Sequence, residues 1–345
     1  MRPRREMQSM TATKKTALHK VAAARTDDPN AVLMGLSAAI VSVKDDRPRA
    51  MVVHRPGTSD ALPFGTFDPV AHRTLEIGLR TWVEEQTGLQ LGYVEQLYTF
   101  GDRGRHLTKP GEGPRVLSVG YLALTHASSG KAATQTEWHD WYSYFPWEDW
   151  RGTKPSIIDA AILPGLQTFV AAGIDAAQRE RRRVRVQLSF GTDGINWDEE
   201  KVLERYELLY ESGLVAEALR DRGGVSAPAG TLGREMKFDH RRILATSMGR
   251  LRGKMKYRPV VFELMPAEFT LLELQRTVEA LSGIRLHKQN FRRLVESQGL
   301  VEGTGRLSRS MGGRPAEQFR FRREVLRERP APGVRLAPRA PARRS

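Results

Sequence analysis

The first half of the chain alternates apolar runs with polar turns, and this pattern predicts strands around one helix. The segments that we expect to form strands are 32–43, 50–54, 93–100 and 116–124. Between the second and third strands, a helix is expected to begin near Asp68, a good N-cap followed by Pro69, and to end at Gly88. Strand, strand, helix, strand, strand is the order of an α/β domain rather than a helical bundle.

The middle of the chain carries weaker signals. The aromatic-rich segment WHDWYSYFPWEDWR at 138–151 could bind a flat ligand, but we expect it to pack in a core, the usual role of clustered Trp and Tyr. An amphipathic pattern closed by glycines predicts one helix at 198–224. Residues 225–233 are predicted to form a linker, and residues 234–257 are predicted to form a long basic helix.

The C-terminal region has the order helix, turn, helix, hairpin, which is typical of a winged helix. Thr270 and Glu273 form a capping-box pattern at the start of a helix that Gly283 ends. A second helix is expected in QNFRRLVESQGL, followed by a loop rich in Gly, Ser and Arg and by the strand-like EQFRFR. We therefore expect a winged helix-turn-helix domain.

Exposed side chains on the second helix and on the loop suit DNA. Arginine pairs bidentately with guanine in the major groove, and Gln or Asn pairs with adenine. The candidate DNA-binding residues are Lys288, Gln289, Asn290, Arg292, Arg293, Arg306, Arg309 and Arg314. The alternative is a winged helix that uses its basic face only for protein contacts.

The amino-acid composition and the distribution of charge limit the classes of function that the chain can have. The formal net charge is +15. The surplus lies in three segments, 1–26, 256–330 and 331–345, whereas residues 27–255 sum to −1. A basic C-terminal segment agrees with nucleic-acid binding. The chain has no cysteine, which excludes disulfides and thiolate catalysis, and no apolar run is long enough to span a membrane. We expect a cytoplasmic protein without a membrane partner.

Several segments resemble the Nudix-related transcriptional regulators, NrtR. In the C-terminal half they are FDHRRIL at 238–244, RLRGKMKYRPVVFELMP at 250–266, FTLLELQ at 269–275, KQNFRRLVE at 288–296 and GRPAEQFRF at 313–321. In the N-terminal half they are EQLYTFGD at 95–102 and SVGYLAL at 118–124. The chain looks most like the longer alphaproteobacterial regulators of NAD metabolism. Shorter members lack material corresponding to about 127–234.

This resemblance implies a homodimeric repressor that binds double-stranded DNA upstream of NAD-metabolism genes. An ADP-ribose-type nucleotide effector would bind the Nudix-like domain and weaken DNA binding, with no cofactor required. Arg103, Arg105 and Arg115 flank strands that border the ligand cleft in Nudix folds, so the resemblance makes them candidates for effector binding.

The Nudix box, G-x5-E-x7-R-E-U-x-E-E-x-G-U with U a bulky apolar residue, tests whether the domain is an enzyme. Anchored on Gly88 and Leu89, the chain has Thr81, Trp82 and Gln86 where the box has Arg, Glu and Glu. A register with one inserted residue aligns Glu84 and Glu85 but still leaves Thr81 at a ligand position. Mg²⁺ needs hard oxygen ligands, so we predict no metal site and no catalytic residue. A Nudix hydrolase of ADP-ribose or a related nucleoside diphosphate remains the alternative.

Together these features predict an α/β Nudix-like sandwich, a mixed sheet with helices, followed by a C-terminal winged helix-turn-helix domain. The expected segments are a disordered basic arm at 1–30, the Nudix-like domain at 31–178, a helical insertion and connector at 179–255, the winged helix at 256–326, and a disordered tail at 327–345.

Overall fold

The computed structural model describes residues 32–102, 115–126, 135–223, 232–308, 315–328 and 333–334, so the expected arm and most of the tail lie outside it. Its strands are β1 (Val32–Lys44), β2 (Arg47–Val53), β3 (Phe64–Thr66), β4 (Tyr93–Phe100), β5 (Arg115–Leu124), β6 (Thr136–Asp140), β7 (Val301–Leu307) and β8 (Glu317–Phe321). Its α-helices are α3 (Leu75–Thr87), α4 (Leu163–Ala171), α5 (Ala176–Phe190), α6 (Val202–Glu211), α7 (Ala216–Asp221), α8 (His240–Met255), α9 (Leu271–Ser282), α10 (Lys288–Ser297) and α11 (Val325–Glu328). Short helical turns are η1 (Trp141–Ser143), η2 (Ile158–Ile162) and η3 (Val260–Leu264).

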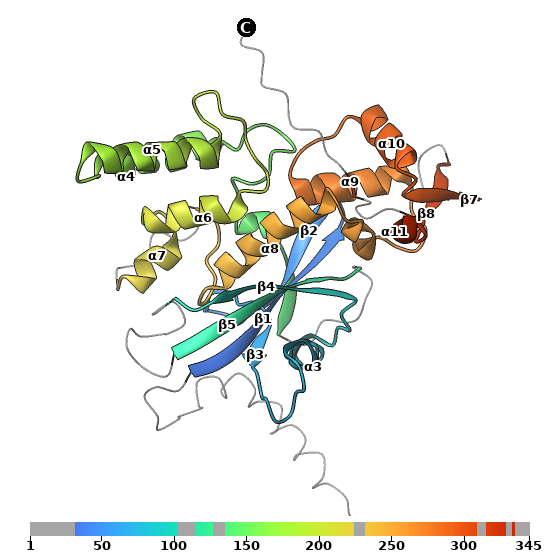
Figure 1. Cartoon of the computed structure of the whole chain (residues 1–345), viewed down its shortest axis with the longest axis horizontal. Helices are drawn as coiled ribbons and strands as arrows, with labels where there is room; N and C mark the ends of the chain where they lie inside the picture. Colours follow the sequence, from blue (N-terminus) through green and yellow to red (C-terminus); the bar gives the residue numbers. More distant parts are fainter. Residues whose placement is uncertain are drawn as a thin grey trace, which may run out of the picture.

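A mixed sheet forms the centre of the N-terminal half (Figure 1). The strands are ordered β4-β5-β1-β2-β6, and β3 pairs with β1 away from this path. β1 and β5 are parallel, with Leu36 opposite Val119, and the other pairs are antiparallel. All four strands expected from the apolar runs are present, and their alternating side chains supply both faces of the sheet.

Two helices cover opposite faces of this sheet. Leu79 and Val83 of α3 pack against Leu36, Ala38 and Ile40 of β1. The intervening residues of β1 face the other way and join the larger core with α8. Helix–sheet–helix layering buries the sheet on both sides, which agrees with the nearly continuous apolar sequence of β1.

The aromatic-rich segment packs as expected. Trp141, Tyr144, Phe145 and Trp147 are fully buried in the larger core, against α6 and α8. The helical insertion that follows stacks α4 on α5, and α6 lies between α5 and α8. In Figure 1 the hairpin of α4 and α5 projects from the body of the molecule.

Three helix predictions need correction. The first helix begins at Leu75 rather than near Asp68, because Asp68 accepts hydrogen bonds from Val70 N and Ala71 N in a separate turn and Thr74 is the real N-cap. The expected helix at 198–224 is two helices, α6 and α7, separated at Gly213, which has a φ of +76°. An L-residue rarely adopts this conformation, so the helix stops there.

The long basic helix expected at 234–257 begins only at His240. Before it, Met236 forms a bridge with Asp60, and Phe238 has a φ of +53°, which is incompatible with a continuous helix. The helix is also central rather than peripheral, because Arg241 and Arg252 are both 1% exposed.

The C-terminal elements α9, α10 and the β7–β8 hairpin form the winged helix, on the opposite side of α8 from most of the sheet (Figure 1). The capping box at Thr270 and Glu273 is present, and Gly283 ends α9 with a φ of +74°. The predicted fold class, a mixed sheet with helices followed by a winged helix-turn-helix, is confirmed. Within the described residues, no helix is long and apolar enough to cross a membrane.

Candidate DNA interface and effector pocket

Helix α10 buries one face and presents the other to solvent. Phe291 and Val295 are in the core. The five DNA-binding candidates of this helix, Lys288, Gln289, Asn290, Arg292 and Arg293, are all exposed. They occupy its first two turns, the part of a recognition helix that enters the major groove in helix-turn-helix proteins. The structure therefore brings these residues together on one accessible face.

Two of these arginines have partners on the same helix. Arg292 Nε donates to Glu296 Oε1 at 2.7 Å, and Arg293 Nη2 donates to Asn290 Oδ1 at 3.2 Å. Both Arg292 and Glu296 are about half exposed, so their ion pair is weak and exchanges readily for a DNA contact.

The wing is the β7–β8 hairpin. Phe321 of β8 stacks on Phe262 of η3 with ring centroids 4.3 Å apart, which fastens the hairpin to the domain. Arg306 is 71% exposed and pairs with Glu268 at 2.9 Å. Arg309 and Arg314 lie outside the described residues, so their contribution stays a prediction.

The end of α9 is bonded to α8 and to the segment that follows β6. Helix C-termini leave carbonyl groups without partners inside the helix. Tyr142 OH donates to Ala280 O at 2.7 Å, Arg252 Nε donates to Leu281 O at 3.0 Å, and Trp150 N donates to Gly283 O at 2.7 Å. These three bonds fix the position of the turn that leads into α10.

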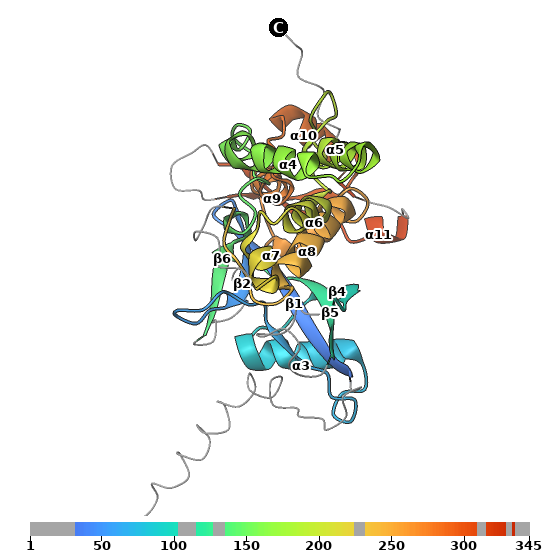
Figure 2. The ribbon, with the colours of Figure 1, turned by 90° about the vertical axis from the view of Figure 1, so that its left-hand side faces the viewer.

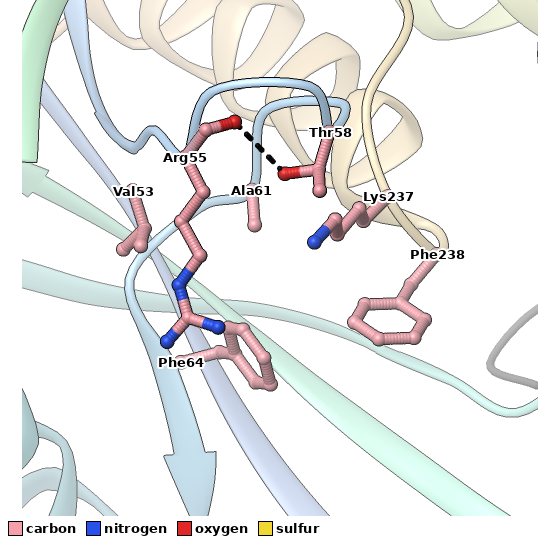
Figure 3. A pocket seen from close by; sticks show the side chains of 7 residues that line it. All are labelled: Val53, Arg55, Thr58, Ala61, Phe64, Lys237 and Phe238. Carbon is pink, nitrogen blue, oxygen red and sulfur yellow. Dashed lines mark hydrogen bonds between the residues drawn. The ribbon is translucent and has the colours of Figure 1, made fainter. Parts of the chain in front are cut away.

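A pocket of about 130 Å³ lies between the β2–β3 connection and the segment before α8 (Figure 3). Its lining residues are Val53, Arg55, Thr58, Ala61, Phe64, Lys237 and Phe238. Arg55 and Lys237 supply two cations, and the rings of Phe64 and Phe238 meet edge to face at 5.7 Å. Burial and the charge of Arg55 lower the pKa of Lys237, so an anion between the two cations would relieve their repulsion.

Beside this pocket, Asp60 is buried and surrounded by donors. His54 Nδ1 lies 2.8 Å and Tyr144 OH 2.5 Å from its carboxylate, and Arg234 Nη2 lies at 2.9 Å. Burial alone would raise the pKa of Asp60, but the hydrogen bonds from His139, Tyr144 and His54 and the charge of Arg234 bring it far below its usual range. Asp60 therefore anchors the β2–β3 connection as a permanent anion.

The box residues of α3 make backbone contacts. Trp82 Nε1 donates to Thr66 O at 2.9 Å. Gln86 bonds Phe64 twice: Nε2 donates to Phe64 O at 2.6 Å, and Oε1 accepts from Phe64 N at 3.3 Å. Glu84 and Glu85 are exposed, and the described residues contain no group of three or more His, Cys, Asp or Glu that could hold a metal ion.

The arginines predicted to bind the effector are Arg103, Arg105 and Arg115. Arg103 and Arg105 lie outside the described residues. Arg115 is the first residue of β5, where its backbone pairs with Val32. Asp102, the residue before Arg103, pairs with Arg242 of α8 at 2.6 Å. Arg242 lies about one helical turn after the pocket residue Phe238.

Four pocket residues were not expected from the sequence: Arg55, Phe64, Lys237 and Phe238. Residues 55 and 64 lie more than 170 positions from 237 and 238, so no local pattern links them. The sequence feature that could have pointed to this pocket is the segment FDHRRIL, because its first residue, Phe238, lines the pocket.

Comparison with known proteins agrees with the C-terminal fold. Residues 261–321 match the family model of the NrtR DNA-binding winged helix domain, which confirms the winged helix. The ADPR responsive transcriptional repressor NtrR of Acinetobacter baylyi is 40% identical over 87 residues. Those residues are 25% of this chain and 34% of that protein, so the match spans about a third of the relative.

Similar solved structures include two of one protein, NrtR of Shewanella oneidensis, and one of a MutT/nudix family protein. Shewanella oneidensis NrtR, solved in complex with a 27mer DNA, has a TM-score of 0.49 and 20% identity over 85% of this chain and 94% of its own. A MutT/nudix family protein from Enterococcus faecalis has a TM-score of 0.48 and 14% identity over 93% and 100%. The NUDIX domain of Shewanella oneidensis NrtR, solved with ADP ribose, has a TM-score of 0.28 and 22% identity over 36% and 83%.

Proposed function

We propose that this protein, whose C-terminal domain is an NrtR-type winged helix, is a homodimeric, DNA-binding transcriptional repressor of NAD-metabolism genes. The observation that carries the proposal is the exposed polar face of α10 within the matched domain. The target genes are inferred from the resemblance of the sequence to NrtR. A single winged helix reads a short half-site, so two-fold pairing of subunits would match a palindromic operator.

A gel-shift assay tests DNA binding. The probe is the region upstream of NAD-biosynthesis genes, and a random duplex of equal length is the control. We expect a sequence-dependent and salt-sensitive shift. Arg292→Ala should weaken specific binding by about 1–3 kcal/mol, the value of a bidentate contact to a base. An equal loss on both duplexes would reassign Arg292 to phosphate contact.

We further propose that the Nudix-like domain senses a nucleotide and does not hydrolyse it. Two cations and two aromatic rings in the pocket of Arg55, Phe64, Lys237 and Phe238 suit a ligand with phosphates and a flat base. Arg103 and Arg105 lie outside the described residues, so the proposal rests on these four residues alone. The ADPR response named for the curated relative points to ADP-ribose as the first ligand to try.

Calorimetric titration with ADP-ribose and related nucleotides tests the pocket. Lys237→Gln and Arg55→Gln should each weaken binding, since each removes a cation from the lining. Arg73→Gln, which removes an exposed cation before α3, is the matched control and should bind like the unaltered protein. Equal affinities for all four proteins would place the effector elsewhere.

Degeneration of the Nudix box supports sensing without turnover. Trp82 and Gln86 are engaged with the backbone of β3, and in either register of the box Glu84 and Glu85 are the only carboxylates that α3 places at box positions. Incubation with ADP-ribose and Mg²⁺ should release no product. Turnover that Glu85→Gln abolishes would contradict this assignment and favour a Nudix hydrolase.

A further inference from the structure

Helix α5 of the helical insertion is strongly basic. Between Ala176 and Phe190 it carries five arginines and one glutamate, a net charge of +4. Four of the arginines, at positions 179, 181, 183 and 185, are exposed, and only Ser189 and Phe190 at the end of the helix are buried. An ordinary solvated helix mixes charges of both signs, so this surplus indicates an anionic partner.

The hairpin fixes α5 in place and leaves part of its charge available. Arg182 lies over the ring of Phe169 in α4, 4.0 Å from its centroid, and donates to Phe169 O at 2.6 Å. Arg179 donates to Gly173 O at 3.0 Å. These two arginines therefore have structural roles in joining α4 to α5.

The remaining arginines are available to a partner. Arg183 and Arg185 form exposed ion pairs, with Glu180 at 2.7 Å and Glu211 at 2.5 Å, which contribute little and exchange easily. Among the residues that the structure describes, no hydrogen bond or ion pair is found for Arg181. Arg181 and Arg183 are thus the side chains through which α5 would reach an anion.

The position of α5 suggests which anion it meets. In both views the α4–α5 hairpin lies at the same end of the molecule as the candidate recognition helix α10, whereas α3 lies at the opposite end (Figures 1 and 2). A duplex that crosses this end to contact α10 would extend past α10, and its flanking phosphates form a regular row of negative charge.

We propose that α5 is a second DNA-contacting element, which binds backbone phosphates that flank the site read by α10. This inference rests on the proposed function, because it assumes that α10 binds DNA. The contact would add affinity without adding sequence preference, since phosphate contacts carry no base information. A second copy of the chain is the less favourable partner, because a two-fold pairing of α5 with itself would bring arginines against arginines.

Binding to two duplexes tests the proposal. One duplex contains only the site protected by the winged helix, and the other extends it with random flanks. The full-length protein should bind the longer duplex more tightly. Arg181→Ala combined with Arg183→Ala should leave binding to the short duplex unchanged and weaken binding to the long one. On the long duplex the slope of log K against log salt should fall by about 0.9 for each lost phosphate contact.

Arg73→Ala is the control, because it removes an exposed cation two residues before α3, and α3 lies at the opposite end of the molecule from α10 (Figures 1 and 2). It should keep the affinity and salt slope of the unaltered protein on both duplexes. If the unaltered protein binds no DNA, the proposed function itself fails. If it binds and the double variant matches it on the long duplex, only the role of α5 is overturned. A dimer that dissociates in the double variant, seen by sedimentation, would also overturn that role and assign α5 to the subunit interface.

Discussion

At the scale of single residues, a buried charge cluster joins the helical insertion to the central helix. Glu148 is 1% exposed and receives two guanidinium groups, Arg205 Nε at 2.6 Å and Arg252 Nη1 at 2.7 Å. Burial alone would raise the pKa of Glu148, but the charges of Arg205 and Arg252 lower it. The carboxylate therefore stays ionised between α6 and α8.

Glu148→Gln should destabilise the fold strongly. The amide has nearly the same shape but no charge, so two buried guanidinium groups would lose their counter-charge. Breaking such a buried pair costs about 3–5 kcal/mol, which urea denaturation followed by circular dichroism would measure. Arg183→Ala, which removes an exposed pair, should change the free energy of unfolding by less than about 1 kcal/mol. Similar small changes in both variants would show that the buried cluster contributes no net stability.

A second residue-scale prediction concerns pH. The hydrogen bond to Asp60 raises the pKa of His139 above its usual 6.5, although burial acts in the opposite direction. Protonated His139 therefore stabilises the fold fully below pH 6.5, and this stabilisation is lost as the pH rises through the raised pKa. His54, Glu137, Tyr144 and Arg234 are the other titratable groups in this cluster.

His139→Gln should make the free energy of unfolding less dependent on pH between about pH 6 and pH 8. The difference between the unaltered protein and the variant should be largest at the acidic end of this range. Chemical denaturation at several pH values measures it. A difference that grows toward alkaline pH would contradict the assignment, because it would require a lowered pKa for His139.

At the scale of elements, α3 uses a position where the Nudix box has a glutamate for a structural contact. Gln86 holds β3 through both its donor and its acceptor. Gln86→Glu would restore the glutamate of the Nudix box but remove the donor to Phe64 O and place a carboxylate beside a carbonyl. We expect a loss of about 1–3 kcal/mol in the free energy of unfolding and no gain of Mg²⁺-dependent hydrolysis. Glu85→Gln, an exposed change on the same helix, is the control and should leave the free energy of unfolding nearly unchanged. If Gln86→Glu hydrolysed the nucleotide, the box would be only one substitution from activity.

The elements that could be predicted are those governed by local sequence. The apolar runs of β1 and β5 and the capping box of α9 predicted their structures because each depends on neighbours within a few residues. The start of α3 was missed because two N-cap candidates, Asp68 and Thr74, compete within one segment, and the second lies directly before the apolar helix.

Long-range partners explain the remaining differences. The helix expected at 234–257 was recognised as basic, but its sequence did not show that Arg241 and Arg252 are buried and paired with Glu217 and Glu148. A local sequence pattern cannot show that Arg252 meets a carboxylate that lies 104 residues away along the chain. The same limit applies to the pocket, whose cations Arg55 and Lys237 come from distant segments.

At the scale of the whole molecule, α8 connects the two candidate sites. The segment before α8 contributes Lys237 and Phe238 to the pocket, and Arg252 near its other end bonds the last turn of α9. Tyr142 adds a second bond to the same turn, at Ala280 O. A ligand that moves the start of α8 would therefore move the turn that sets the orientation of α10. Such coupling is reciprocal, so DNA should weaken nucleotide binding by the factor by which the nucleotide weakens DNA binding.

Tyr142→Phe tests this route with little change in packing, because it removes only the hydroxyl, which donates to Ala280 O and accepts from Arg252 Nη2. DNA affinity without nucleotide should stay close to that of the unaltered protein, since α10 is untouched. The coupling free energy, from DNA titrations with and without saturating ADP-ribose, should fall by about 0.5–2 kcal/mol. Tyr98→Phe removes an exposed hydroxyl on β4 and should leave the coupling unchanged. Full coupling in Tyr142→Phe would mean that the signal reaches α10 through Arg252 alone or through contacts between subunits.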